Sequence, residues 1–228
     1  IDRLALDWRP TRLLRREIAI DAVAADNVFV ARRPLGNPDG GTGAPFDPDS
    51  LVRDLRDIQV NSLTVGTLTA AAPVFGEAAT MTVAGSLRDQ DGGKTLTLTL
   101  ERSDQPGHAR LTARADAQSR TLKLDAATAG FSALADIAAA GTNATLTGTV
   151  RLERAAEQTR GYIAATVGGT WRDPSLVAAF DVGNLTIVSR PVSQVAGTVR
   201  AQRTQSGAYA VTGEGTMSDV SEALPELA

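Results

Sequence analysis

Lys94 to Glu101 reads K-T-L-T-L-T-L-E, an unbroken alternation of threonine and leucine. Successive side chains of a β-strand point to opposite faces of the sheet, so the three leucines share one face and the three threonines share the other. Just before this stretch, Asp89 to Gly93 reads D-Q-D-G-G, and Asp-Gly and Gly-Gly pairs supply the positive φ angles that tight hairpins require. The sequence therefore predicts a strand with one apolar face, entered from a hairpin turn.

The same alternation recurs along most of the 228 residues. Several of these segments continue through a glycine, as in Met81 to Gly85 and Ser193 to Val199, and a glycine within a strand often marks a bend or a bulge. We therefore expect an all-β fold, built as one elongated, curved antiparallel sheet rather than a globule. Strands are expected at residues 3–8, 17–22, 27–33, 58–60, 63–69, 78–87, 94–101, 109–115, 121–126, 144–153, 161–167, 176–182, 185–188, 195–202 and 208–213.

Three segments interrupt the alternation. Thr11 to Arg16 is expected to form one helical turn or a bend, and Arg33 to Ser50, dense in Pro, Gly and Asp, is expected to be a long loop. Phe131 to Ala140 (F-S-A-L-A-D-I-A-A-A) has apolar residues at helical spacing, so it predicts one short helix, ended by Gly141. Gly141 is also a possible seam in what otherwise reads as a single elongated segment spanning residues 1–228.

Composition restricts both the core and the partners. Aromatic residues make up only 4% of the chain, whereas a compact sandwich of this size fills its centre with large rings, so the core is expected to be thin or elongated. The formal net charge of −3 gives no basic surface that could neutralise nucleic-acid phosphates. We therefore expect no nucleic-acid partner.

Residues that could carry chemistry are scarce. The chain has no cysteine, and its single histidine, His108, follows a predicted Pro-Gly turn, where a solvated position is more plausible than a general base. Asp89 and Asp91 resemble the start of a calcium loop, but the remaining ligand spacing and the closing Glu are missing. We expect no catalytic residue, metal or cofactor, and hence no enzyme.

Parts of the chain resemble a known family. The motif that carries most of the likeness runs from L-D-W-R-P-T-R-L-L at Leu6 to Leu14, through Ile18 to Ile20, to V-F-V-A-R-R-P at Val28 to Pro34. Further similar segments are Ile58 to Leu63, Val74 to Gly76, Ala84 to Ser86, Gly168 to Pro174 and Gly197 to Val199. Together they resemble an interior stretch of the TamB family of bacterial translocation and assembly module subunits, in the AsmA-like group.

The resemblance implies a β-taco-like fold, a sheet curled into a groove with an apolar interior. It also implies a location in the bacterial cell envelope, as the periplasmic part of a longer protein anchored in the inner membrane. The family is associated with lipid delivery to the outer membrane and with outer-membrane biogenesis and protein secretion. The partners it implies are phospholipid acyl chains and an outer-membrane assembly protein of the Omp85 type.

On this interpretation one set of alternating apolar residues lines the groove. The expected lining residues are Ile18, Ile20, Val28, Val30, Val83, Leu96, Leu98, Leu100, Leu111, Leu122, Leu124, Leu146, Val150, Ile163 and Val167. Periodicity alone favours the dry core of a sandwich, because most half-buried sheets simply pack, and the resemblance reverses that preference. Two other functions stay open: a chaperone-like scaffold that pairs its sheet edge with strands of outer-membrane proteins such as autotransporters, and an adhesive or carbohydrate-binding β-sandwich.

Overall fold

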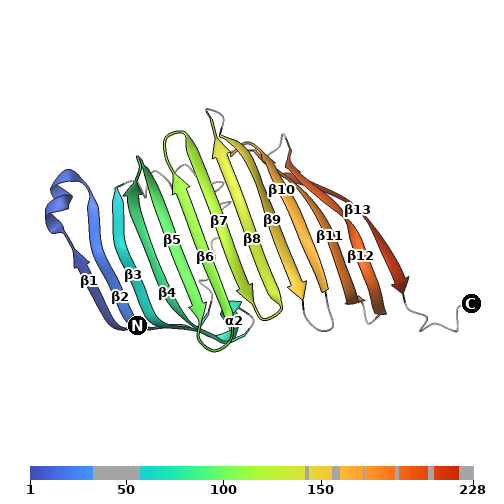
Figure 1. Cartoon of the computed structure of the whole chain (residues 1–228), viewed down its shortest axis with the longest axis horizontal. Coiled ribbons are helices and arrows are strands. Elements are labelled where there is room, and N and C mark those ends of the chain that lie inside the picture. Colours follow the sequence, from blue (N-terminus) through green and yellow to red (C-terminus); the bar gives the residue numbers. More distant parts are fainter. Residues whose placement is uncertain are drawn as a thin grey trace, which may run out of the picture. The chain divides into compact units, whose positions relative to one another are not determined.

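The computed structural model describes residues 1–32, 57–75, 77–141, 144–155, 160–171, 173–187, 190–204 and 208–220. It divides into two compact units, Ile1–Ala117 (unit 1) and Gln118–Ala228 (unit 2). Both are built almost entirely of β-strands, which confirms the predicted all-β class (Figure 1). The predicted loop at Arg33 to Ser50 lies outside the described residues.

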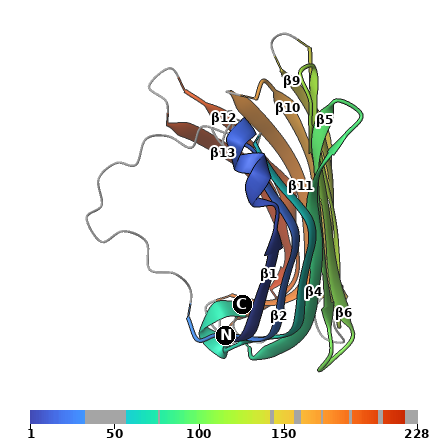
Figure 2. The same ribbon diagram turned by 90° about the vertical axis from the view of Figure 1, so that its left-hand side faces the viewer.

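Unit 1 contains six strands that pair in the order of the chain. Their bounds are β1 Asp2–Trp8, β2 Ile18–Val30, β3 Ile58–Ala70, β4 Ala79–Gln90, β5 Gly93–Arg102 and β6 Gly107–Ala115, with a 3₁₀ turn η1 at Pro10–Arg15 and one helical turn α2 at Ala72–Phe75. All pairs are antiparallel except β2 with β3, which run parallel. Strands such as β2 and β4 bow along their length (Figure 2). Because the strands pair in chain order, each one contacts mainly the strands before and after it, and no second sheet of described residues packs on unit 1.

Unit 2 contains seven strands, again in chain order and all antiparallel. Their bounds are β7 Ser119–Thr128, β8 Phe131–Ala140, β9 Thr145–Ala155, β10 Arg160–Gly169, β11 Pro174–Ile187, β12 Arg190–Arg203 and β13 Tyr209–Val220. Gly141, the possible seam, lies in the connection between β8 and β9, which pair from Ala140–Thr145 to Phe131–Arg154. The division of the chain instead falls between Ala117 and Gln118.

Turn chemistry explains the hairpins. Asp91 and Gly92 connect β4 to β5 with φ angles of 48° and 76°, as expected of the primed turn that the D-Q-D-G-G stretch predicts. The predicted turn at Thr11 to Arg16 is also present as η1. It begins with a proline and ends at Arg16, whose φ of 59° allows its amide to donate to the Leu13 carbonyl at 2.9 Å.

The predicted helix at Phe131 to Ala140 is wrong, because this segment is strand β8. It pairs along its whole length with β7 on one side and β9 on the other, so ladder hydrogen bonds on both edges replace those of a helix. In three places, two predicted strands form one strand in the structure: 17–22 and 27–33 form β2, 58–60 and 63–69 form β3, and 176–182 and 185–188 form β11. The strands are longer and fewer than the sequence pattern indicates.

Candidate functional site

Apolar side chains of unit 1 lie in rows that cross the sheet. We call a row a set of residues paired from one strand to the next, because paired residues point to the same face. The row through Leu98 consists of Leu6, Val23, Leu63, Gly85, Leu98 and Leu111. The row through Leu96 consists of Trp8, Ile20, Val60, Leu87, Leu96 and Ala113, and the row through Leu100 of Leu4, Ala25, Val65, Val83, Leu100 and Ala109.

Further pairs extend the same face toward both ends of β2. Val28 pairs with Leu68, Val30 with Ala70, and Ile18 with Ile58. Irregular register between Val60 and Leu63, and again between Val65 and Leu68, inserts an extra residue that keeps the apolar side chains of β3 on one face. All nine candidate residues of unit 1 therefore lie on a single face.

Unit 2 repeats this arrangement. Its rows run Leu122, Ile137, Gly148, Val167, Leu176, Ala201, Val211; then Leu124, Ala135, Val150, Ala165, Ala178, Val199, Gly213; then Ala126, Ala133, Leu152, Ile163, Phe180, Gly197, Gly215. Leu146 pairs with Ala139 on the same face. The six candidate residues of this unit thus also share one face. We call these two surfaces the apolar faces of unit 1 and unit 2.

The opposite face of each unit is mostly polar, with a few exposed apolar side chains such as Phe29, Leu134 and Val177. In unit 1, Thr97 pairs with Ser86, and their hydroxyl oxygens are 2.9 Å apart. Arg110 donates to Glu101 on the neighbouring strand at 3.0 Å. In unit 2, Lys123 forms an ion pair of 3.1 Å with Asp136. Such cross-strand pairs satisfy polar groups on the wet side of a sheet, so water covers this face.

The apolar faces are not covered as a sandwich core would be. No large side chain among the described residues is fully buried. Most of the buried apolar residues are alanines, whose small side chains are shielded by the larger ones beside them. On the apolar side of interior strands, Phe131 of β8 is 44% exposed and Ile163 of β10 is 40% exposed. A second packed layer would exclude water from the central rows. Within the described part of the chain, each apolar face is therefore open.

Charged residues mark where the apolar face of unit 1 ends. Lys94 and Arg102 lie on this face at the two ends of β5, on either side of its leucines, and their side chains are only 13% and 12% exposed. Lys94 donates to the Ile58 carbonyl at 2.8 Å and is 2.9 Å from Asp89. Their alkyl stems cover apolar surface while their charged groups reach polar partners at the rim.

Two carboxylates neutralise Arg102. Its guanidinium donates to Glu77 at 2.7 Å and to both oxygens of Asp104, at 2.7 and 3.0 Å. These hydrogen bonds lower the pKa of Glu77 and lower the pKa of Asp104 to about 2. The charge at this end of the face is thus fully compensated.

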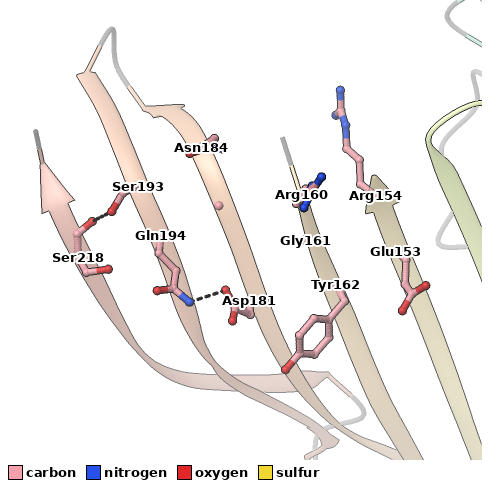
Figure 3. Close-up of a pocket in the computed structure, with 11 residues that line it drawn as sticks. Glu153, Arg154, Arg160, Gly161, Tyr162, Asp181, Asn184, Ser193, Gln194 and Ser218 are labelled. Carbon is pink, nitrogen blue, oxygen red and sulfur yellow. Dashed lines mark hydrogen bonds between the residues drawn. The ribbon is translucent and has the colours of Figure 1, made fainter. Parts of the chain in front are cut away.

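In unit 2 the ends of the apolar face differ. Arg120 pairs with Ala139, and its guanidinium stacks over the Trp171 ring, 5.5 Å from the centroid. Arg154 ends the apolar side of β9. An open cavity of about 580 Å³ crosses β9 to β13 here, and most of its lining belongs to the opposite, polar face, on which Glu153, Tyr162 and Asp181 form one row (Figure 3). The residues that line this cavity are Glu153, Arg154, Arg160, Gly161, Tyr162, Asp181, Gly183, Asn184, Ser193, Gln194 and Ser218.

Several residues of the apolar faces were missed by the sequence interpretation. They are Leu63, Val65, Leu68, Met81, Leu87, Ala133, Ala135, Ile137, Leu152, Phe180 and Val199. Alternation in residues 176–182 could have identified Phe180. In β3 and β8 the signal is obscured, by irregular register in the first and by an alanine-rich helical pattern in the second.

The structure also shows where the other residues considered for chemistry lie. His108 is the second residue of β6, directly after the bend at residues 103–106, and lies opposite Glu101. Among the described residues, no three His, Asp or Glu side chains are grouped so that they could hold a metal ion. No helix in the described part of the chain has the length and apolar character needed to cross a bilayer. Comparisons with models of protein families, with curated proteins and with solved structures found no match.

Proposed function

We propose that the two apolar faces hold phospholipid acyl chains, and that the chain is an interior segment of a periplasmic envelope protein of the TamB kind that carries lipid between membranes. The observation that carries the proposal is a continuous apolar face, several strands wide, that no described residue covers. On this proposal the sheet is curled, β-taco-like, around its apolar side, and an Omp85-type protein receives the distal end of the full-length protein.

The proposed mechanism is physical. Transfer of an acyl chain from water to an apolar surface gains roughly 0.8 kcal/mol for each methylene that is fully buried. A chain with about 12 shielded methylenes therefore gains on the order of 10 kcal/mol without any specific bond. Because neighbouring rows offer equivalent apolar surface, the chain can move from row to row with little change in energy. No catalytic residue is required.

The alternation of β5 offers a matched test. A photo-crosslinking amino acid at Leu98 should label co-purified or added phospholipid, whereas the same amino acid at Thr97, on the opposite face of the same strand, should not. Leu124 and Lys123 form the corresponding pair in unit 2. Equal labelling from both faces, or labelling from neither in a chain that retains its fold, would overturn the proposal.

A second function has one observation in its favour. Among the described residues β13 pairs only with β12, so its other edge presents unpaired backbone groups over 12 residues. A long open edge can accept a strand of an unfolded outer-membrane protein. This scaffold role predicts that peptides from outer-membrane strands crosslink to β13 and not to β10. If phospholipid crosslinks at Leu98 while no peptide crosslinks at β13, the scaffold role is excluded.

A further inference from the structure

The turn η1, which joins β1 to β2, presents apolar side chains to solvent. Leu14 is 89% exposed, the highest fraction of any large apolar side chain in the described part of the chain, and Leu13 is 47% exposed. Trp8, the last residue of β1, and Ile18, the first of β2, are each 42% exposed. A single exposed leucine is ordinary, but here exposed apolar residues gather at one turn.

Polar contacts hold this turn in a fixed shape. The Arg9 guanidinium donates to Asp21 at 2.6 Å, and that of Arg12 donates to Glu17 at 2.8 Å. The Glu17 amide also donates to the Arg12 carbonyl at 3.2 Å, which closes the end of η1. The exposure of the two leucines therefore belongs to a defined conformation, and the charges of Arg9 and Arg12 are compensated within it.

Two further arginines of the turn keep their charge. Arg15 and Arg16 are exposed, and neither has a polar partner among the described residues. No acidic residue occurs from Pro10 to Arg16. The turn thus combines exposed leucines with uncompensated positive charge, so a partner that suits it must offer both apolar groups and anions.

The place of η1 in unit 1 narrows the choice of partner. It follows the edge strand β1, so it lies at a corner of the sheet, at the end of β1 opposite the N-terminus (Figure 1). A flat surface can reach a corner without contacting either face of the sheet. Anionic bilayers offer phosphates to arginine and, just below them, an apolar region to leucine.

We infer that η1 binds the surface of an anionic phospholipid bilayer. Leu13 and Leu14 enter the boundary between headgroups and acyl chains, and Arg15 and Arg16 contact lipid phosphates. The inference goes beyond the proposed function and does not depend on it, because it requires no lipid on the apolar faces.

Sedimentation with vesicles tests the inference on the full 228-residue chain. Vesicles of equal parts phosphatidylcholine and phosphatidylglycerol should bind the wild type, and phosphatidylcholine alone should bind it roughly tenfold more weakly. Leu13→Ala/Leu14→Ala should weaken binding to the anionic vesicles about tenfold or more, and Arg15→Gln/Arg16→Gln should have a similar effect. The control is Leu134→Ala, which truncates a leucine that is 50% exposed on the polar face of β8 and should leave binding unchanged.

A fluorescent label gives a local measurement. The chain has no cysteine, so a nitrobenzoxadiazole label can be attached at Leu14→Cys alone, or at Leu134→Cys as the control. Anionic vesicles should shift the emission to the blue at the first position and not at the second. The inference is overturned if the wild type does not bind anionic vesicles, if the leucine double variant binds like the wild type, or if both labels respond alike.

Diphenylhexatriene, an uncharged apolar fluorophore, reports the apolar faces in the absence of vesicles and separates the inference from the proposed function. It should bind the Leu13→Ala/Leu14→Ala variant as it binds the wild type. Normal diphenylhexatriene binding without vesicle binding overturns the inference alone. Vesicle binding through η1 without diphenylhexatriene binding overturns the proposed function alone.

Discussion

The two apolar faces follow the same alternation, but rows within them differ in side-chain size. The row through Leu98 in unit 1 is dominated by leucine, whereas the row through Ala165 in unit 2 consists of Leu124, alanines, valines and Gly213. Alanine ends close to the backbone, so an apolar chain can approach the sheet more closely at the row through Ala165 than at the row through Leu98. The comparison shows that alternation determines which face is apolar, and that side-chain volume determines how closely a ligand can approach the backbone of that face.

The ends of the faces differ in the same way. In unit 1, Lys94 and Arg102 each reach an acidic partner, whereas Arg154 in unit 2 reaches none among the described residues. Acidic partners therefore compensate the charges at the end of the apolar face in unit 1, whereas the charge of Arg154 in unit 2 stays uncompensated within the described part of the chain. The experiments below test these differences.

The largest effect is expected from a charge in the middle of the unit 1 face. Leu98→Asp replaces a half-buried leucine between Gly85 and Leu111 by a carboxylate, so it should destabilise the fold by about 3 kcal/mol and abolish lipid crosslinking from a photo-crosslinking amino acid at Leu111. Thr97→Asp, on the exposed polar face, should change stability by less than about 1 kcal/mol. Urea unfolding measures both. Equal effects from the two variants would contradict the assignment of faces.

A smaller loss is expected in unit 2, where glycines permit close packing. A Cβ at Gly197 would collide with the Glu214 carbonyl oxygen and lie 2.8 Å from the Phe180 ring. Gly197→Ala should therefore cost about 2 kcal/mol in urea unfolding. The matched control is Gly168→Ala, where the nearest atom would be the Ser175 hydroxyl oxygen at 3.4 Å. If Gly168→Ala is destabilised and Gly197→Ala is not, steric collision does not explain the need for glycine in these strands.

A larger side chain on the apolar face of unit 2 tests whether a ligand binds close to the sheet there. Ala178→Leu adds volume to the apolar face, and because no described layer covers that face, stability should change by less than about 1 kcal/mol. Binding of diphenylhexatriene should fall several-fold. Ala179→Leu, one residue along on the polar face, should leave binding unchanged. A strongly destabilised Ala178→Leu variant would instead indicate a covered, tightly packed face.

The smallest effect concerns the charges around Arg102. Asp104 and Glu77 have lowered pKa values because Arg102 donates to them, and their pKa values return to normal when the chain unfolds. Their contribution to stability is present above about pH 4 and is lost as the pH falls through about 2. Melting temperatures should show Arg102→Gln to be less stable than the wild type at pH 7, with a gap that narrows toward pH 2. A constant gap would exclude this linkage.

Much of the fold follows from the period of two in the sequence. Every candidate residue, from Ile18 to Val167, lies on the apolar face of its unit, because alternation alone fixes the face once a strand forms. The β8 segment misled because its alanines favour a helix and Leu134, Ile137 and Ala138 lie at helical spacing. In the structure Ala133, Ala135 and Ile137 point to the apolar face and Leu134 to the other. Pairing on both sides overrides local propensity there.

Two features could not be derived from the sequence. The first is the parallel pairing of β2 with β3, because alternation is the same for a strand that pairs parallel and for one that pairs antiparallel. The compensated charges at Arg102 and the uncompensated charge at Arg154 depend on which strands become neighbours. Side-chain partners of this kind arise from register, which is a property of pairs of segments.

The pairing of strands in chain order has a consequence for how each unit unfolds. Because each strand is held almost wholly by the strands before and after it, stability within a unit is a sum of nearest-neighbour terms, as in a linear array of repeats. Such an array loses structure from its ends, one strand at a time. Amide hydrogen exchange should therefore be faster in β1 than in β3 and β4 of unit 1, and faster in β13 than in β9 and β10 of unit 2. Under mechanical load the strands of a unit would peel away in sequence.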